Sequence, residues 1–160
     1  MNVLILCTGN SARSIIGEAL ISAEPGFQAF SAGSTPKGEP HPAALAVLMA
    51  KGHDVSGFRS KSWDEFSGDD APAMDIIITV CDNAAGETCP WWPGHPVQVH
   101  WGLPDPAAVE EMNFQRAAFE DTYASLQKRI KAMTALPLAD MTPEARKTAL
   151  QEIHSPQRAG

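Results

Sequence analysis

The sequence predicts an α/β protein in three layers, with a four-stranded parallel sheet and helices on both of its faces. Segments with the composition of strands alternate along the chain with segments that have the spacing of helices, which is typical of βαβ units with right-handed crossovers. Residues 2–6 (NVLIL) are also an unbroken apolar run, as expected of a strand buried on both faces of a parallel sheet. The 160 residues are enough for one domain with a hydrophobic core.

The four expected strands are marked with different strengths. Residues 74–80 (MDIIITV) give the strongest strand pattern in the chain, and the apolar run at 2–6 is a second expected strand. Residues 27–33 (FQAFSAG) end in a glycine turn, and residues 96–101 (PVQVHW) are a weaker candidate. These four segments make up the predicted sheet.

Helices are expected over residues 14–23, 42–51, 113–136 and 141–153. Pro42 is favoured at a first helical position, and Gly52 is a typical C-terminal stop for the same helix. The segment 113–136 is long and amphipathic. Thr142 is a possible N-cap, with Pro143 at the first position, so a short final helix follows.

Composition and charge restrict the class of protein. Hydrophobic residues make up 44% and charged residues 19%, which is ordinary for a globular domain. The formal net charge of −7 argues against nucleic acid or an anionic membrane surface as the main partner. No apolar run approaches the ~20 residues of a membrane span, and MNVLIL is too short for a signal peptide and has no basic start. We expect a cytoplasmic monomer with no nucleic-acid or membrane partner.

Reactive side chains follow three of the predicted strands. Cys7, Cys81 and the segment 104–106, which contains Asp105, each come directly after a strand. Because ligands bind beyond the carboxyl ends of parallel strands, two thiols and a carboxylate should gather at one rim. The third cysteine is Cys89, and three cysteines are too few, and odd in number, for a disulfide scaffold. A catalytic or redox role is therefore favoured.

The stretch CTGNSARS (residues 7–14) joins the first strand to the first helix and has the composition of an anion-binding loop. Such a turn points backbone N–H groups inward at a helix N-terminus. We expect an oxyanion to be bound by Thr8, Gly9, Asn10, Ser11, Ala12, Arg13 and Ser14. It is not a nucleotide P-loop, because G-x-x-x-x-G-K-[ST] is absent and the loop has no lysine.

Individual roles follow from the residue types in this loop. Arg13 offers a planar fork that can bind a tetrahedral oxyanion with two hydrogen bonds. A helix N-terminus and a nearby cation lower a thiol pKa from about 8.5 by one to several units, so Cys7 should be a thiolate aimed at the oxyanion. Ser14 could donate to its sulfur, and Asn10 could fix the loop from a left-handed conformation. The alternative, a small buried hydrophobe at position 7, is disfavoured by these polar neighbours.

The stretch VLILCTGNSARS, with its C-x5-R-S pattern, resembles the low-molecular-weight protein tyrosine phosphatase family. Residues 30–61 are similar to that family's second strand, loop and helix, and Asp105–Pro106 matches its general-acid position. The resemblance covers roughly residues 2–135. It implies a domain at residues 1–136 with that fold, followed by a C-terminal extension at 137–160, which we expect to be helical and partly flexible.

Three further stretches resemble the thioredoxin-coupled arsenate reductases built on this fold. They are CDNAAGETC (81–89), CPWWPG (89–94) and HWGLPDPA (100–107). The thiol chemistry supports the same interpretation. If the Cys7 thiolate attacks arsenate, a second thiol, Cys81, can attack the Cys7 sulfur and release arsenite, and Cys89 can take over the disulfide for an external dithiol. Asp105 could protonate the leaving hydroxyl or assist the second thiol, although it could also be a helix N-cap only.

Other functions remain open at this point. A phosphatase needs Cys7, Arg13 and Asp105 alone, but the segment DPAAV lacks the tyrosines that follow this Asp-Pro in many of the phosphatases. A non-catalytic oxyanion-binding module would have no use for Cys81 and Cys89. The expected partners are arsenate as substrate and thioredoxin as electron donor, with glutathione and glutaredoxin as the alternative donor.

No metal or cofactor is predicted. A zinc site is disfavoured because the spacing of the candidate ligands matches no common zinc pattern; they are Cys81, Cys89, His95 and His100. Some thioredoxin-coupled relatives bind potassium with an asparagine, a glutamate, a serine and an aspartate. Asn10, Glu18 and Ser31 match the first three, but Lys61 stands near the fourth position, and its ammonium could replace the ion.

Overall fold

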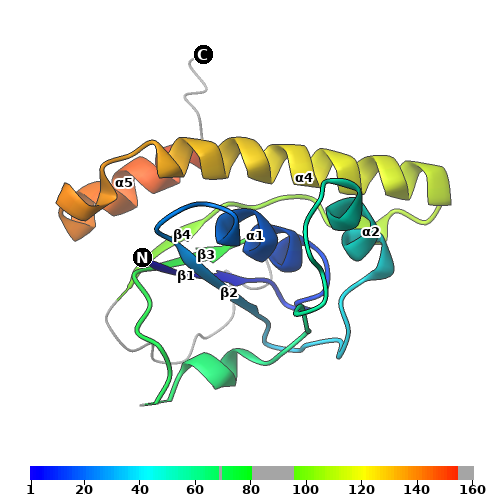
Figure 1. Cartoon of the computed structure of the whole chain (residues 1–160), viewed down its shortest axis with the longest axis horizontal. Helices are drawn as coiled ribbons and strands as arrows, with labels where there is room; N and C mark the ends of the chain where they lie inside the picture. Colours follow the sequence, from blue (N-terminus) through cyan, green and yellow to red (C-terminus); the bar gives the residue numbers. More distant parts are fainter. Residues whose placement is uncertain (69, 81–95, 155–160) are drawn as a thin grey trace.

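The computed structural model of the chain describes residues 1–68, 70–80 and 96–154, and Figure 1 shows its arrangement. In chain order the elements are β1 (Asn2–Leu6), α1 (Arg13–Ser22), β2 (Gln28–Ala32), α2 (Pro42–Ala50), the 3₁₀ helix η1 (Trp63–Phe66), β3 (Ile76–Thr79), β4 (Val97–His100), the 3₁₀ helix η2 (Pro106–Ala108), α4 (Met112–Thr134), the 3₁₀ helix η3 (Leu138–Asp140) and α5 (Pro143–His154). Each strand and helix that the sequence predicts is present.

The sheet has the strand order β2-β1-β3-β4, and all three pairings are parallel. In the centre of the sheet Val3 is in register with Ala29 on one side and Ile76 on the other. Because the strands are parallel, their carboxyl ends lie at one edge. The predicted four-stranded parallel α/β fold is confirmed.

Strand β1 is buried on both faces, as its unbroken apolar run indicates. Val3 and Ile5 belong to the larger core cluster, which also contains buried residues of α1, α2 and α4. Leu4 and Leu6 point to the other face, into a smaller cluster with Phe66 of η1. The alternation follows the two-residue period of a strand.

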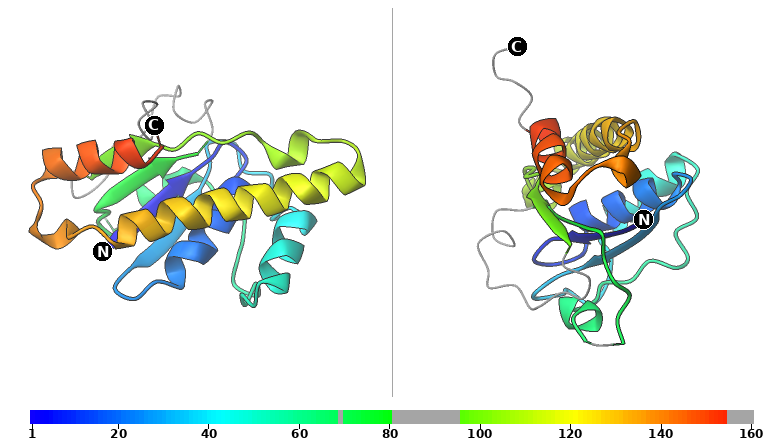
Figure 2. Two further views of the ribbon diagram at one scale, coloured as in Figure 1. Left: turned by 90° about the horizontal axis from the view of Figure 1, so that it is seen from above. Right: turned by 90° about the vertical axis from the view of Figure 1, so that its left-hand side faces the viewer.

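The two faces of the sheet are covered differently. Figures 1 and 2 show α1, α4 and α5 on one face and the segment containing η1 on the other. In the described part of the chain, the second face carries one short 3₁₀ helix, η1. Its Phe66 and Trp63 pack with Met74. In the part of the chain that the structure describes, no helix is both long and apolar enough to cross a membrane.

The C-terminal segment packs on the edge strand β4. The side-chain amide of Gln151 accepts a hydrogen bond from His100 N (3.0 Å) and donates one to His100 O (2.8 Å). Trp101 Nε1 donates to Leu150 O at 2.8 Å, and Leu150 is fully buried in the larger core cluster. Helix α5 thus satisfies backbone groups that the edge of the sheet would expose.

Candidate active site

Cys7 lies at the carboxyl end of β1 and is almost completely buried, with 4% of its surface exposed. Its N–H donates to Ala32 O at 3.2 Å, where β2 ends. The residues after it, 8–14, run from β1 into the first turn of α1; we call them the Cys7 loop. The structure therefore places the thiol at the rim of the sheet.

Hydrogen bonds from outside the Cys7 loop set its orientation. Three carbonyl oxygens of the loop accept hydrogen bonds from backbone N–H groups that follow β2. Thr8 O accepts from residue 35 (3.0 Å), Gly9 O from residue 37 (3.0 Å) and Ser11 O from residue 41 (2.8 Å). In a planar trans peptide the N–H of the next residue points the opposite way, and no cis peptide is present in the described chain. The N–H groups that follow these three carbonyls are thus directed away from the outer bonds, as an anion-binding loop requires.

Asn10 holds the turn in the loop. Its φ of 44° is the left-handed conformation expected from the sequence, and its side chain is fully buried. Asn10 Nδ2 donates to Ser14 Oγ (2.8 Å) and Ser31 Oγ (3.0 Å), and Asn10 Oδ1 accepts from Lys61 N (2.8 Å). Three partners therefore stabilise a backbone conformation that non-glycine residues rarely adopt.

Gly33 allows β2 to approach the Cys7 loop closely. A Cβ at this position would lie 2.4 Å from Thr8 O and 2.5 Å from Cys7 O. Any side chain there would push the backbone of the loop away from the sheet. Position 33 therefore requires glycine for space.

The guanidinium of Arg13 is fixed by a hydrogen bond from one of its nitrogens, while another of its nitrogens has no partner among the described residues. Its Nη1 donates to Leu103 O at 2.8 Å, and its Nη2 lies 3.8 Å from Asp105 Oδ2. The Nε atom is buried and has no hydrogen-bond partner among the described residues. A buried, unpaired N–H on a cation is costly, so this N–H is a candidate donor to a ligand.

Asp105 comes after β4 and lies near Arg13, with 41% of its side chain exposed. Its Oδ1 accepts from Ala107 N at 2.9 Å, so it also caps η2. The two carboxylate oxygens thus have different neighbours, the cap on one side and the guanidinium on the other. The structure brings together Cys7, Arg13 and Asp105 at the same edge of the sheet.

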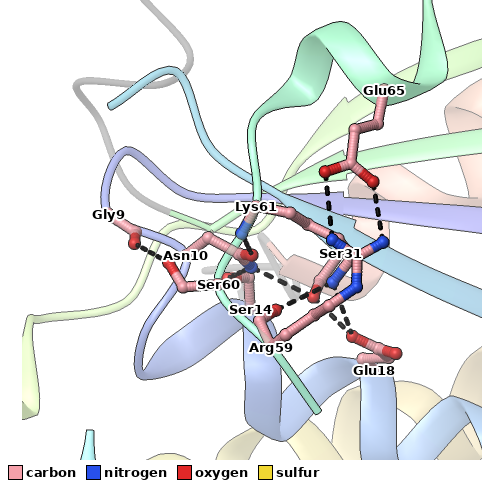
Figure 3. A network of polar contacts seen from close by, with 9 residues as sticks. All are labelled: Gly9, Asn10, Ser14, Glu18, Ser31, Arg59, Ser60, Lys61 and Glu65. Carbon is pink, nitrogen blue, oxygen red and sulfur yellow. Dashed lines mark hydrogen bonds and ion pairs between the residues drawn. The ribbon is translucent and has the colours of Figure 1, made fainter. Parts of the chain in front are cut away.

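A polar network lies beneath the Cys7 loop (Figure 3). Glu18 Oε1 accepts a short hydrogen bond from Ser31 Oγ (2.5 Å) and lies 3.7 Å from Lys61 Nζ. Lys61 Nζ also donates to Arg59 O at 3.0 Å, and only 8% of the Lys61 side chain is exposed. Asn10 joins this group through Ser31 and the Lys61 backbone.

Burial changes the ionisation of both charged groups in this network. It raises the pKa of Glu18 above its ordinary value, against the opposing effects of the Ser31 hydrogen bond and the Lys61 charge. Burial also lowers the pKa of Lys61, and the charge of Glu18 opposes that shift. The Lys61 ammonium thus lies beside Glu18, and the Lys61 backbone is bonded to Asn10.

Two of the predicted site residues, Cys81 and Cys89, lie outside the described part of the chain, and so does His95, a candidate ligand of the disfavoured zinc site. Val80, the last described residue before Cys81, donates its N–H to Leu6 O at 3.0 Å, and Leu6 directly precedes Cys7. His100 Nδ1 lies 2.8 Å from Thr79 Oγ1. Within residues 1–68, 70–80 and 96–154, no three His, Cys, Asp or Glu side chains form a group that could hold a metal ion.

Sequence reasoning did not identify the residues that support the loop from a distance. Three hydrogen bonds connect the loop to residues far away in the sequence. Lys61 N donates to Asn10 and Ser60 Oγ donates to Gly9 O (3.1 Å), each across 51 residues, and Arg13 donates to Leu103 O across 90 residues. Of these residues the sequence indicated only Lys61, and it did so for the ammonium rather than for the backbone N–H.

Comparison with known proteins gives a family and several relatives. Residues 2–144 match the model of the low molecular weight phosphotyrosine protein phosphatase family. An arsenate reductase from Brevibacillus brevis is 38% identical over 120 residues, which cover 74% of this chain and 86% of the relative.

Two solved structures are similar as well. An arsenate reductase from Archaeoglobus fulgidus is 26% identical, with a TM-score of 0.60, over 81% of this chain and 98% of that chain. A thioredoxin-dependent arsenate reductase from Corynebacterium glutamicum is 27% identical, with a TM-score of 0.54, over 81% of this chain and 61% of that chain.

Proposed function

The chain belongs to the low molecular weight phosphotyrosine protein phosphatase family, and we propose that its activity within that family is the reduction of arsenate to arsenite. The observation that carries this proposal is the buried Arg13 Nε, which has no partner among the described residues and belongs to the loop that follows the buried Cys7. An oxyanion bound to the loop would have its central atom facing the thiol of Cys7. The names of the relatives favour arsenate as that oxyanion.

Binding comes first. Arsenate is a tetrahedral oxyanion like phosphate, so inward N–H groups of the Cys7 loop and the Arg13 guanidinium can hold its oxygens. The N-terminus of α1 and the Arg13 charge favour the thiolate form of Cys7. Because Arg13 is fixed by Leu103 O, the guanidinium is oriented before the ligand arrives.

Reduction then follows in two thiol steps. The Cys7 sulfur attacks arsenic, and one hydroxyl leaves as water with a proton from Asp105, so an arsenic(V) thiol ester forms. The Cys81 thiolate attacks the Cys7 sulfur, the sulfur–arsenic bond breaks, and its electron pair stays on arsenic. Arsenite departs, and the two cysteines are left as a disulfide.

Regeneration requires Cys89 and an external dithiol. The Cys89 thiolate attacks the Cys81 sulfur and frees Cys7 as a thiolate, so the disulfide moves to Cys81–Cys89. A dithiol protein then reduces it. The relative from Corynebacterium glutamicum is thioredoxin-dependent, which supports thioredoxin as the donor, with glutathione and glutaredoxin as the alternative. Such a cycle requires a reducing compartment, so we place the protein in the cytoplasm and assign the whole relay to one chain, acting as a monomer.

Hydrolysis of phosphate monoesters is the second candidate, and the family match favours it as a side activity. It uses the same attack by Cys7, with Arg13 on the equatorial oxygens and Asp105 as acid and then base. Neither Cys81 nor Cys89 takes part, so the two activities can be separated by mutation.

The test is to count thiols after one equivalent of arsenate is added to the reduced chain. The relay predicts the loss of two thiols and the release of one arsenite, and thioredoxin with its reductase should restore all three thiols. Release of phosphate from an aryl ester with no arsenite and no thiol loss would assign the site to the phosphatase. Recovery with glutathione and glutaredoxin alone would replace thioredoxin as donor.

A further inference from the structure

Lys37 lies against the Cys7 loop at Gly9, although it is 28 residues away in the sequence. Its N–H donates to Gly9 O at 3.0 Å. Its side chain crosses the α-carbon of Gly9, because a Cβ built there would lie 3.1 Å from Lys37 Cε, 3.3 Å from Cγ and 3.4 Å from Cδ. The glycine thus leaves space that the lysine stem occupies.

The backbone on both sides of Lys37 is tied to the same point. Gly38 has a φ of 94°, and its N–H donates to Ser60 Oγ at 3.2 Å. Ser60 Oγ in turn donates to Gly9 O at 3.1 Å, as Figure 3 shows. The place of the lysine is therefore set by backbone contacts, and its Cε, one bond from the ammonium, lies beside Gly9.

No residue in the described part of the chain neutralises the charge of Lys37. Three other lysines form ion pairs: Lys51 with Glu120, Lys61 with Glu18 and Lys131 with Glu24. Lys37 is exposed, and among the described residues its ammonium has neither an ion pair nor a hydrogen bond. In a chain with a net charge of −7, this leaves an uncompensated cation beside a loop built for anions.

We propose that Lys37 recruits the inorganic oxyanion to the Cys7 loop. Its ammonium attracts doubly charged arsenate or phosphate across a short stretch of solvent and so lowers the KM, and it takes no part in bond making or breaking. The identity of the substrate rests on the proposed function, whereas the attraction concerns any oxyanion that the loop binds.

Screening by salt distinguishes this role from a structural one. An attraction through solvent weakens as the Debye length falls from ~30 Å at 0.01 M salt to ~3 Å at 1 M. Packing of the lysine stem on Gly9 has no such dependence. Lys37→Arg keeps the charge, Lys37→Gln removes it and Lys37→Glu reverses it, so the effects should follow that order.

The experiment measures how inorganic phosphate protects Cys7 of the reduced full chain against iodoacetamide, with the modified peptide identified by mass. At ~0.01 M salt, Lys37→Gln should raise the half-protecting phosphate concentration about three- to tenfold, Lys37→Glu more, and Lys37→Arg less than about twofold. At ~1 M salt all variants should agree within about twofold. Lys51→Gln, which changes the net charge equally at the far end of α2, should behave as the wild type.

Two results would overturn the proposal. One is equal protection in Lys37→Gln and Lys51→Gln at low salt. The other is a loss that is the same at low and high salt, which would assign Lys37 a packing role. Arsenite release by the wild type is measured beside these assays. If it is absent while phosphate protection still depends on Lys37, the reductase proposal fails and the recruiting role stands.

Discussion

The two sides of the Cys7 loop differ in how completely their polar groups are satisfied. Beneath the loop, Asn10, Ser31, Glu18 and Lys61 are all hydrogen-bonded or paired with one another. Arg13 lies near Asp105 through its Nη2, and its Nε has no partner among the described residues. The difference indicates that the underside maintains the shape of the loop, and we propose that the Arg13 side takes the ligand.

Removal of the Lys61 charge should have the largest effect on stability. Lys61→Met keeps most of the side-chain volume but leaves Glu18, whose side chain is 16% exposed, without its cation. The free energy of unfolding should fall by about 2–4 kcal/mol, because the remaining group is mostly buried and uncompensated. Urea unfolding followed by circular dichroism measures this loss.

Matched variants make this test specific. Lys51→Met breaks the exposed pair with Glu120 and should cost no more than about 1 kcal/mol. Glu18→Gln in the Lys61→Met background should recover part of the loss, because an amide does not need a cation. Equal losses in Lys61→Met and Lys51→Met would show that the underside is not the stabilising side.

Arg13→Lys should have the next largest effect, and on binding rather than stability. A lysine keeps the charge but has no fork and no Nε–H, so phosphate or arsenate affinity should fall by about 1.5–3 kcal/mol. Isothermal titration calorimetry on the reduced chain measures the affinity. The free energy of unfolding should change by less than about 1 kcal/mol. If Arg13→Lys unfolds easily but binds phosphate normally, Arg13 stabilises the fold and does not hold the ligand.

The pH dependence of stability should show the smallest effect. The pKa of Glu18 is raised in the folded state, so the folded chain holds this proton more tightly than the unfolded chain. Its contribution is therefore fully present below the unfolded pKa and is lost as the pH rises through the raised value. Glu18→Gln should lack this decline when unfolding is measured from pH 4 to pH 8. Parallel curves for the two proteins would mean that Glu18 titrates normally.

The fold could be predicted because its signals are local. The run at residues 2–6 marks the central strand, and Pro42 and Gly52 bound α2. Pro143 begins α5 after Thr142, whose hydroxyl accepts from Ala145 N. The left-handed Asn10 could be predicted too, since an asparagine tolerates that conformation in a tight turn.

What could not be predicted depends on contacts between distant segments. No sequence pattern indicates that Lys61 N bonds Asn10, that Leu103 O holds Arg13, or that Gln151 covers the edge of β4. The layer formed by η1 on the second face is a similar case, because residues of β1, β2, η1 and β3 come together in it with Met74. Such contacts arise only once the sheet has brought these segments together.

We propose that three cysteines act in order, and a single-turnover assay of two serine variants tests this order most directly. With one equivalent of arsenate, Cys89→Ser should release one arsenite and stop as a Cys7–Cys81 disulfide, which peptide mapping would identify. Cys81→Ser should release none, because the arsenic adduct on Cys7 has no second thiol to attack it. Weak hydrolysis of an aryl phosphate should survive in both. Multi-turnover reduction of arsenate by both variants would contradict the account.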